Sequence, residues 1–172
     1  MTHDTPKETW IGALELAPKI AERLGIYLAQ MTSFELALNK YFGILAGLST
    51  PDIAETVFGR IINISTRLEI VEALAELPRN AAWQPRLNEL IKMAWDINKC
   101  RNEYVHGAYR VQMPEQAVTL LTWATSKGRK SAAYVLDEKA IDADILQIRS
   151  FLGDTMSLFH PDLELPNSGL PT

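Results

Sequence analysis

The chain has few of the residues that build cross-links or metal sites. It holds one cysteine, Cys100, and three histidines among 172 residues. A single cysteine cannot form an internal disulfide, and the histidines are scattered rather than set at the spacings of metal ligands. We therefore expect no disulfide framework, no metal site and no cofactor.

The sequence also lacks a surplus of basic charge and a long apolar run. Its 21 acidic residues outnumber its 17 Lys and Arg residues, which gives a formal net charge of −4. Nonspecific nucleic-acid binders use an overall basic field, so a nucleic-acid site here must be a local patch. No run reaches the roughly 18 to 20 apolar residues of a membrane span, and the N-terminus lacks the features of a signal peptide. We expect a cytoplasmic protein without membrane contact.

What is present fits one globular domain. Apolar residues make up 47% of the chain, enough to close a hydrophobic core. The length suits a single domain, since domains usually have roughly 100 to 200 residues. We expect that domain to cover residues 1–172, with its elements between about 18 and 159 and with loose ends at 1–8 and 161–172.

The spacing of apolar residues predicts a mainly helical protein. A long first helix is expected from Pro18 to about Ala46, because apolar side chains recur there every three or four positions. Two shorter helices follow. The first has a cap and a proline start at 50–52, and the second opens at Ser65 or Thr66.

The second half of the chain alternates between helix and strand. A helix is expected from about 86 to 106, with Gly107 ending it in the left-handed conformation. Stretches rich in β-branched and aromatic residues then predict a hairpin of two strands or three, and helical spacing returns after Asp137. The strand stretches are 109–113, 118–125 and 132–136, with a basic turn at 126–130.

A helical projection of residues 86–106 places polar side chains among apolar ones. Arg101 lies in the middle of the apolar arc, and Asn98, Asn102 and His106 share one edge of it. A buried guanidinium needs a carboxylate or several acceptors, because its lost hydration must be replaced. Glu35 lies at the border of the apolar stripe of the first helix, which predicts an ion pair between Glu35 and Arg101.

The end of this helix resembles a known family motif. It reads Arg101-Asn102-Glu103-Tyr104-Val105-His106, that is, Arg, a polar residue that is often Asn, three variable residues and His. This pattern is similar to the RNxxxH motif of the HEPN superfamily, the higher eukaryotes and prokaryotes nucleotide-binding domain. The order of the helices between about 18 and 159 also resembles that family, whereas the β-hairpin before the last helix departs from its minimal bundle.

The resemblance implies an antiparallel HEPN-like bundle of about four to five helices that forms a homodimer with its two motifs near the twofold axis. In active members it implies metal-independent RNA cleavage. His106 would take the proton from a ribose 2′-hydroxyl, and Arg101 would stabilise charge on the phosphate. Asn102 or Asn98 would orient the phosphate or the imidazole. Supporting roles fall to three further residues: Glu35, Glu103 and Tyr104.

Two functions remain open on these residues. One is an endoribonuclease, a toxin or antiviral component with an inhibitor protein or a nucleotidyltransferase encoded separately. The other is a catalytically idle HEPN module that binds nucleotide, nucleic acid or a protein partner. The intact set of Arg101, Asn102 and His106 favours the first, and the acidic net charge favours the second. His106 before a glycine is also typical of a helix C-cap, and Arg101 could serve only to anchor Glu35.

Overall fold

The computed structural model describes residues 9–11, 14–48, 50–122 and 132–160. These residues belong to two compact units, each formed by two separate stretches of chain. We call the first the sheet unit (1–29 and 99–145) and the second the helical unit (30–98 and 146–172). Three long helices contribute residues to both units, so neither unit is a simple N- or C-terminal half.

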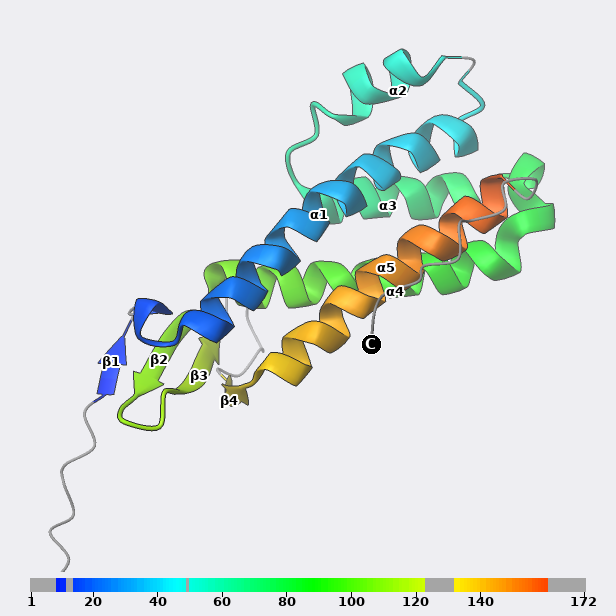
Figure 1. Cartoon of the computed structure of the whole chain (residues 1–172). Helices are drawn as coiled ribbons and strands as arrows, with labels where there is room; N and C mark the ends of the chain where they lie inside the picture. Colours follow the sequence, from blue (N-terminus) through cyan, green and yellow to red (C-terminus); the bar gives the residue numbers. More distant parts are fainter. Residues whose placement is uncertain (1–8, 12–13, 49, 123–131, 161–172) are drawn as a thin grey trace, which may run out of the picture. The chain divides into compact units, whose positions relative to one another are not determined.

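The described chain is mainly helical, as the apolar spacing predicted. The elements, labelled in Figure 1, follow the order β1 (Thr9–Ile11), η1 (Leu14–Leu16), α1 (Pro18–Leu45), α2 (Pro51–Phe58), α3 (Ile64–Ala75), η2 (Pro78–Trp83), α4 (Gln84–His106), β2 (Ala108–Gln112), β3 (Ala117–Thr122), β4 (Ala132–Leu136) and α5 (Glu138–Phe159). The expected helix boundaries are therefore confirmed to within a few residues. None of the described helices is long and apolar enough to cross a membrane.

Local side-chain contacts explain where two of the helices begin. Asn63, not Ser65 or Thr66 as expected, caps α3, because its Oδ1 accepts from the backbone N–H of Ser65 at 2.8 Å and of Thr66 at 3.4 Å. Asp137 plays the same part for α5, where its Oδ1 accepts from the N–H of Ala140 at 2.8 Å.

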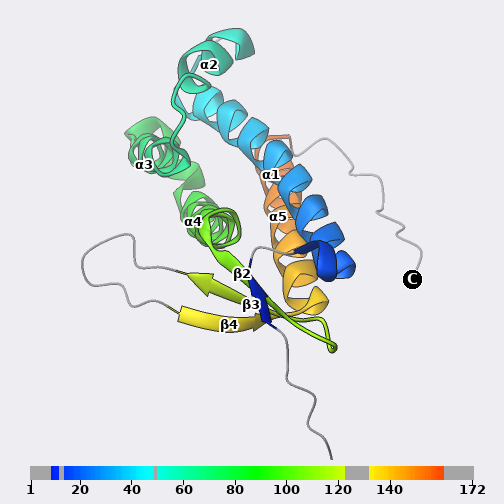
Figure 2. The same ribbon diagram turned by 90° about the vertical axis from the view of Figure 1, so that its left-hand side faces the viewer.

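The sheet unit contains a small antiparallel sheet with the strand order β1-β2-β3-β4. Figure 2 shows its strands side by side. The three strands predicted from the sequence are present, and Val111 on β2 faces Val118 on β3. The N-terminal strand β1, which pairs with β2, was not predicted. The basic turn at 126–130 and both expected loose ends lie outside the described residues.

Gly107, between α4 and β2, was expected to take a left-handed conformation and does not. Its importance is steric, because a Cβ at this position would lie 2.5 Å from Leu120 Cδ1 and 3.1 Å from the carbonyl oxygen of Leu121. The absence of a side chain therefore lets β3 approach the end of α4 closely.

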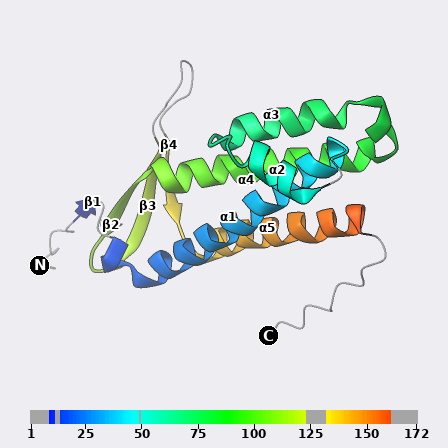
Figure 3. The ribbon, with the colours of Figure 1, turned by 90° about the horizontal axis from the view of Figure 1, so that it is seen from above.

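The helical unit is held together by aromatic side chains. Phe34 of α1 and Phe151 of α5 have ring centroids 5.0 Å apart, and Phe42 of α1 stacks on Phe58 of α2 at 4.4 Å. Within this unit, Figure 3 shows α3 running beside α4. Buried Asn80 connects η2 to its neighbours, since its amide donates to the carbonyl oxygens at the ends of α1 and α3.

Candidate functional site

Three polar side chains of the family-like motif meet at the end of α4, within the sheet unit. Arg101 Nη1 donates to Asn102 Oδ1 at 3.1 Å and lies 3.5 Å from His106 Nε2. Arg101 is half-buried, whereas Asn102 and His106 are exposed. We call these three residues the Arg101 group. Its guanidinium is thus reachable from solvent and in contact with both an amide and an imidazole.

The contact between Arg101 and His106 sets the chemistry of the imidazole. A guanidinium has only N–H donors, so a hydrogen bond from Nη1 requires a lone pair on Nε2 of His106. Nε2 has that lone pair in the neutral tautomer that carries its proton on Nδ1. His106 in that form can accept a proton at Nε2.

The residues between Arg101 and His106 hold the helix end in place. The Tyr134 hydroxyl donates to Glu103 Oε2 at 2.5 Å, and the Tyr104 hydroxyl donates to Asp144 of α5. The Tyr104 ring also makes an edge contact with Tyr27, at 4.9 Å between centroids. Glu103 and Tyr104 therefore support the Arg101 group by fixing its helical turn against β4, α5 and α1.

Burial keeps the phenol of Tyr104 and the thiol of Cys100 in this supporting cluster protonated. It raises the pKa of Tyr104, which the hydrogen bond to Asp144 raises further, and it raises the pKa of the Cys100 thiol to about 12. Burial also raises the pKa of Asp144, although hydrogen bonds from Tyr104 and Cys100 act in the opposite direction. Tyr104 and Cys100 thus act as hydrogen-bond donors to Asp144 at neutral pH rather than as nucleophiles.

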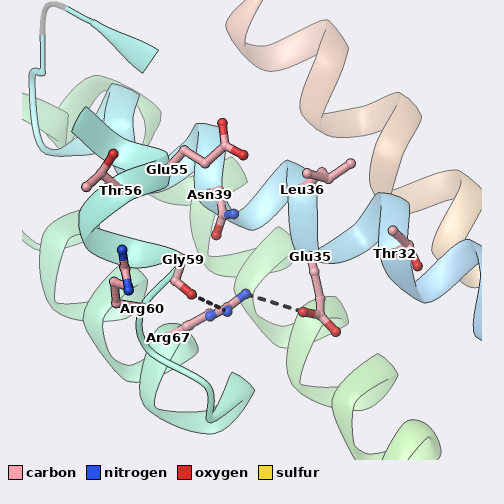
Figure 4. A pocket seen from close by; sticks show the side chains of 9 residues that line it. All are labelled: Thr32, Glu35, Leu36, Asn39, Glu55, Thr56, Gly59, Arg60 and Arg67. Atoms are coloured by element: carbon pink, nitrogen blue, oxygen red, sulfur yellow. Dashed lines mark hydrogen bonds and ion pairs between the residues drawn. The ribbon is translucent and has the colours of Figure 1, made fainter. Parts of the chain in front are cut away.

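The expected ion pair between Glu35 and Arg101 is wrong. Glu35 Oε2 instead lies 3.4 Å from Nη1 of Arg67 on α3, in the helical unit (Figure 4). Arg67 is 6% exposed, whereas Arg101 is half-buried. Among the described residues, the buried arginine that pairs with a carboxylate is therefore Arg67. The sequence did carry a signal for it, because Arg67 falls on the apolar face of α3 beside Ile64 and Leu68.

Asn98 has a structural contact of its own. It belongs to the helical unit, is 3% exposed, and donates from its amide to Ser65 Oγ at 3.1 Å. This bond joins α4 to the first turn of α3. Its expected role in orienting a phosphate has no support from this contact, since the amide is already used within the core.

Comparisons with known proteins leave the site to be judged on its own geometry. No family model matches the chain, and no curated protein and no solved structure matches it. Across the described residues, no group of three or more His, Cys, Asp or Glu side chains could hold a metal ion. Of the predicted site residues, the structure brings Arg101, Asn102 and His106 together in the sheet unit.

Proposed function

We propose that the chain is a HEPN-type endoribonuclease that cleaves RNA without a metal ion. The reaction is attack of a ribose 2′-hydroxyl on the adjacent phosphorus. His106 is the general base, Arg101 binds the phosphate, and Asn102 orients the guanidinium.

The observation that carries this proposal is the position of Arg101 Nη1, 3.1 Å from Asn102 Oδ1 and 3.5 Å from His106 Nε2. A base and an anion-binding group within one hydrogen bond of each other suit a reaction in which a proton leaves and negative charge develops on neighbouring oxygens. The exposure of Asn102 and His106 supports it further, since a polymer must reach the group from solvent.

In the proposed reaction, solvent supplies the proton that the leaving oxygen takes up. A bound phosphate draws the Arg101 guanidinium onto its oxygens, which frees Nε2 of His106. His106 takes the 2′-hydroxyl proton, the 2′-oxygen bonds to phosphorus, and the bond from phosphorus to the 5′-oxygen breaks. Water protonates the leaving 5′-oxygen, and the hydroxide formed takes the proton from His106, which restores the base. The products are a 2′,3′-cyclic phosphate end and a 5′-hydroxyl end.

The test is RNA cleavage by the purified protein in the presence of EDTA. The wild-type protein should cut RNA and leave 2′,3′-cyclic phosphate ends. His106→Ala should lower the rate by roughly 10² to 10⁴, the usual contribution of a positioned acid or base. His160→Ala is the matched control, because His160 is also exposed and follows α5 in the other unit. Cleavage that is equal in the wild type and His106→Ala would refute the proposed role of His106.

A second candidate is a module that binds RNA or nucleotide at the same group without cutting it. The formal net charge of −4 favours a short ligand such as a nucleotide, because an acidic surface repels the rest of a long polyanion beyond the local site. Binding of RNA without cleavage, weakened by Arg101→Ala, would establish this function in place of the nuclease.

We also propose that the working form is a homodimer. Val105, the residue before His106, is 42% exposed, and Leu28 of the same unit is 46% exposed. A symmetric contact that covers such side chains would bring two Arg101 groups near its axis. Light scattering should give a dimer at micromolar concentration, and Val105→Asp should shift it to monomer. A wild-type monomer would contradict the assembly.

A further inference from the structure

The helical unit contains a polar cavity that the proposed nuclease does not use. The cavity has a volume of about 440 Å³ and is lined by residues of α1, α2, the turn after α2, and α3 (Figure 4). Pockets for small ligands usually have roughly 300 to 1,000 Å³. The size therefore suits a small molecule, and the chemistry of the lining decides which one.

Two of the four charged groups in the lining are used within the protein. Arg67 Nη1 pairs with Glu35 at 3.4 Å, its Nε donates to the carbonyl oxygen of Ile61 at 2.5 Å, and its Nη2 lies 3.5 Å from that of Gly59. These contacts hold the Arg67 side chain in place in the lining of the cavity. The pair contributes no net charge for a ligand to neutralise.

Three further groups in the lining are not used. Glu55 and Arg60 are exposed, and neither makes an ion pair with any described residue. Asn39 Oδ1 is buried without a hydrogen-bond partner among those residues. A Cβ added at Gly59 would lie 4.0 Å from Asn39 Nδ2, which places this amide beside the turn that leads to Arg60. A buried acceptor without a donor calls for a ligand that brings an N–H or O–H.

We propose that this cavity binds a free amino acid. Its ammonium group, which has three donors and no acceptor, is held by Glu55 and Asn39 Oδ1. Its carboxylate is held by Arg60, whose planar guanidinium matches a carboxylate with two parallel hydrogen bonds. Glu55, Arg60 and Asn39 Oδ1 each gain the kind of partner that they lack.

Charge balance favours a zwitterion over other small ligands. The lining carries two Glu and two Arg side chains and is formally neutral. A phosphate dianion would bring its charge beside Glu35 and Glu55, and a divalent cation would do so beside Arg60 and Arg67. A zwitterion leaves the cavity neutral, because its positive group pairs with Glu55 and its negative group pairs with Arg60.

The experiment is titration calorimetry and thermal denaturation with each standard L-amino acid added separately. At least one should bind with one site per chain and raise the Tm. The matching decarboxylated amine and N-acetylated acid should bind at least about tenfold more weakly, because each lacks one of the charged ends. Inorganic phosphate and adenosine monophosphate should leave the Tm unchanged.

The variants Glu55→Gln and Arg60→Gln should each weaken binding about tenfold or more. Both residues are exposed, so folding should be kept, which circular dichroism can verify. Glu72→Gln and Arg149→Gln are the matched controls, since both positions are exposed in the same unit and outside the cavity. The proposal is overturned if no amino acid binds, if binding persists in both cavity variants, or if only phosphate or the nucleotide binds. None of these results depends on RNA cleavage.

Discussion

Two arginines, one in each unit, show how the same side chain can be used for stability or for binding. Arg67 in the helical unit is 6% exposed, and its donors meet a carboxylate and two backbone carbonyl oxygens. Arg101 in the sheet unit is half-buried and contacts an amide oxygen and an imidazole nitrogen. The first has its charge compensated inside the protein, and the second still has a full positive charge to offer to an anion.

The difference follows from the cost of burying charge. A guanidinium taken out of water destabilises the fold unless a carboxylate and further acceptors replace its hydration, so a fully enclosed arginine acts mainly as a structural connector. A partly exposed arginine keeps much of its hydration and can exchange it for a ligand. The comparison therefore predicts that loss of Arg101 affects function and loss of Arg67 affects stability.

Of the two arginines, Arg101 should have the larger effect, namely that of Arg101→Ala on RNA cleavage. Removing one preorganised donor to a developing negative charge usually lowers the rate by about 10² to 10³, and we expect that range here. The free energy of unfolding should change by less than about 1 kcal/mol, because no carboxylate among the described residues loses its partner. Initial cleavage rates and urea denaturation measure the two quantities. Lys99→Ala, exposed on the same helix, is the control, and a stability loss without a rate loss would reverse the comparison.

Arg67→Ala should give the opposite pattern. It should lower the free energy of unfolding by about 2 to 3 kcal/mol, less than the roughly 3 to 5 kcal/mol of fully buried pairs, since Glu35 is 39% exposed and can regain hydration. The cleavage rate of the folded protein should stay unchanged. Urea denaturation followed by circular dichroism is the measurement. A loss below about 0.5 kcal/mol would mean that the pair behaves as a surface ion pair.

The sequence predicts the helices and strands of this fold better than it predicts which residues and strands contact one another. Starts at Pro18 and Pro51 follow from proline at the first helical turn, which is a local property. Asn63 was missed as a cap because Ser65 and Thr66 are equally good capping residues nearby. Strand β1 has three residues and is defined by its pairing with β2, which no local pattern reveals.

The site divides in the same way. The Arg101 group could be predicted because its members lie within six consecutive residues of one helix and so stay close together however the helix packs. The partner of Glu35 could not, since a projection shows that a carboxylate faces inward but not which of several arginines lies opposite. The orphaned Asn39 Oδ1 depends on how α2 and α3 pack against α1, and it becomes visible only in the folded unit.

Two glycines of α1 test whether the packing around the cavity is as tight as the enclosure of Arg67 suggests. A Cβ at Gly43 would lie 2.8 Å from the Cβ of Ala54 on α2, whereas a Cβ at Gly25 would have no atom within 4 Å. Gly43→Ala should therefore destabilise by about 1 to 2 kcal/mol through overpacking. Gly25→Ala should stabilise by about 0.5 to 1 kcal/mol through helix propensity. Equal shifts of Tm in the two variants would show that α2 can move away from α1 at little cost in free energy.

The smallest effect concerns Asp144, a half-buried carboxylate of the sheet unit. Burial raises the pKa of Asp144 above its ordinary value of 3.8, so the folded state holds this proton more tightly than the unfolded chain. The resulting stability is fully present below that ordinary value and is lost as the pH rises through the folded pKa. Asp144→Asn removes the titration and keeps an oxygen that can accept from Tyr104.

The variant should consequently gain stability relative to the wild type as the pH rises from acidic to neutral. We expect a gain of at most about 1 kcal/mol, because the remaining hydrogen bonds contribute on that scale. Urea denaturation at matched pH values measures the difference, with Asp154→Asn on the exposed face of α5 as the control. A variant that instead becomes relatively less stable toward neutral pH would mean that Asp144 favours its charged form. The sheet unit would then stabilise the charge of half-buried Asp144, as the helical unit stabilises that of buried Arg67.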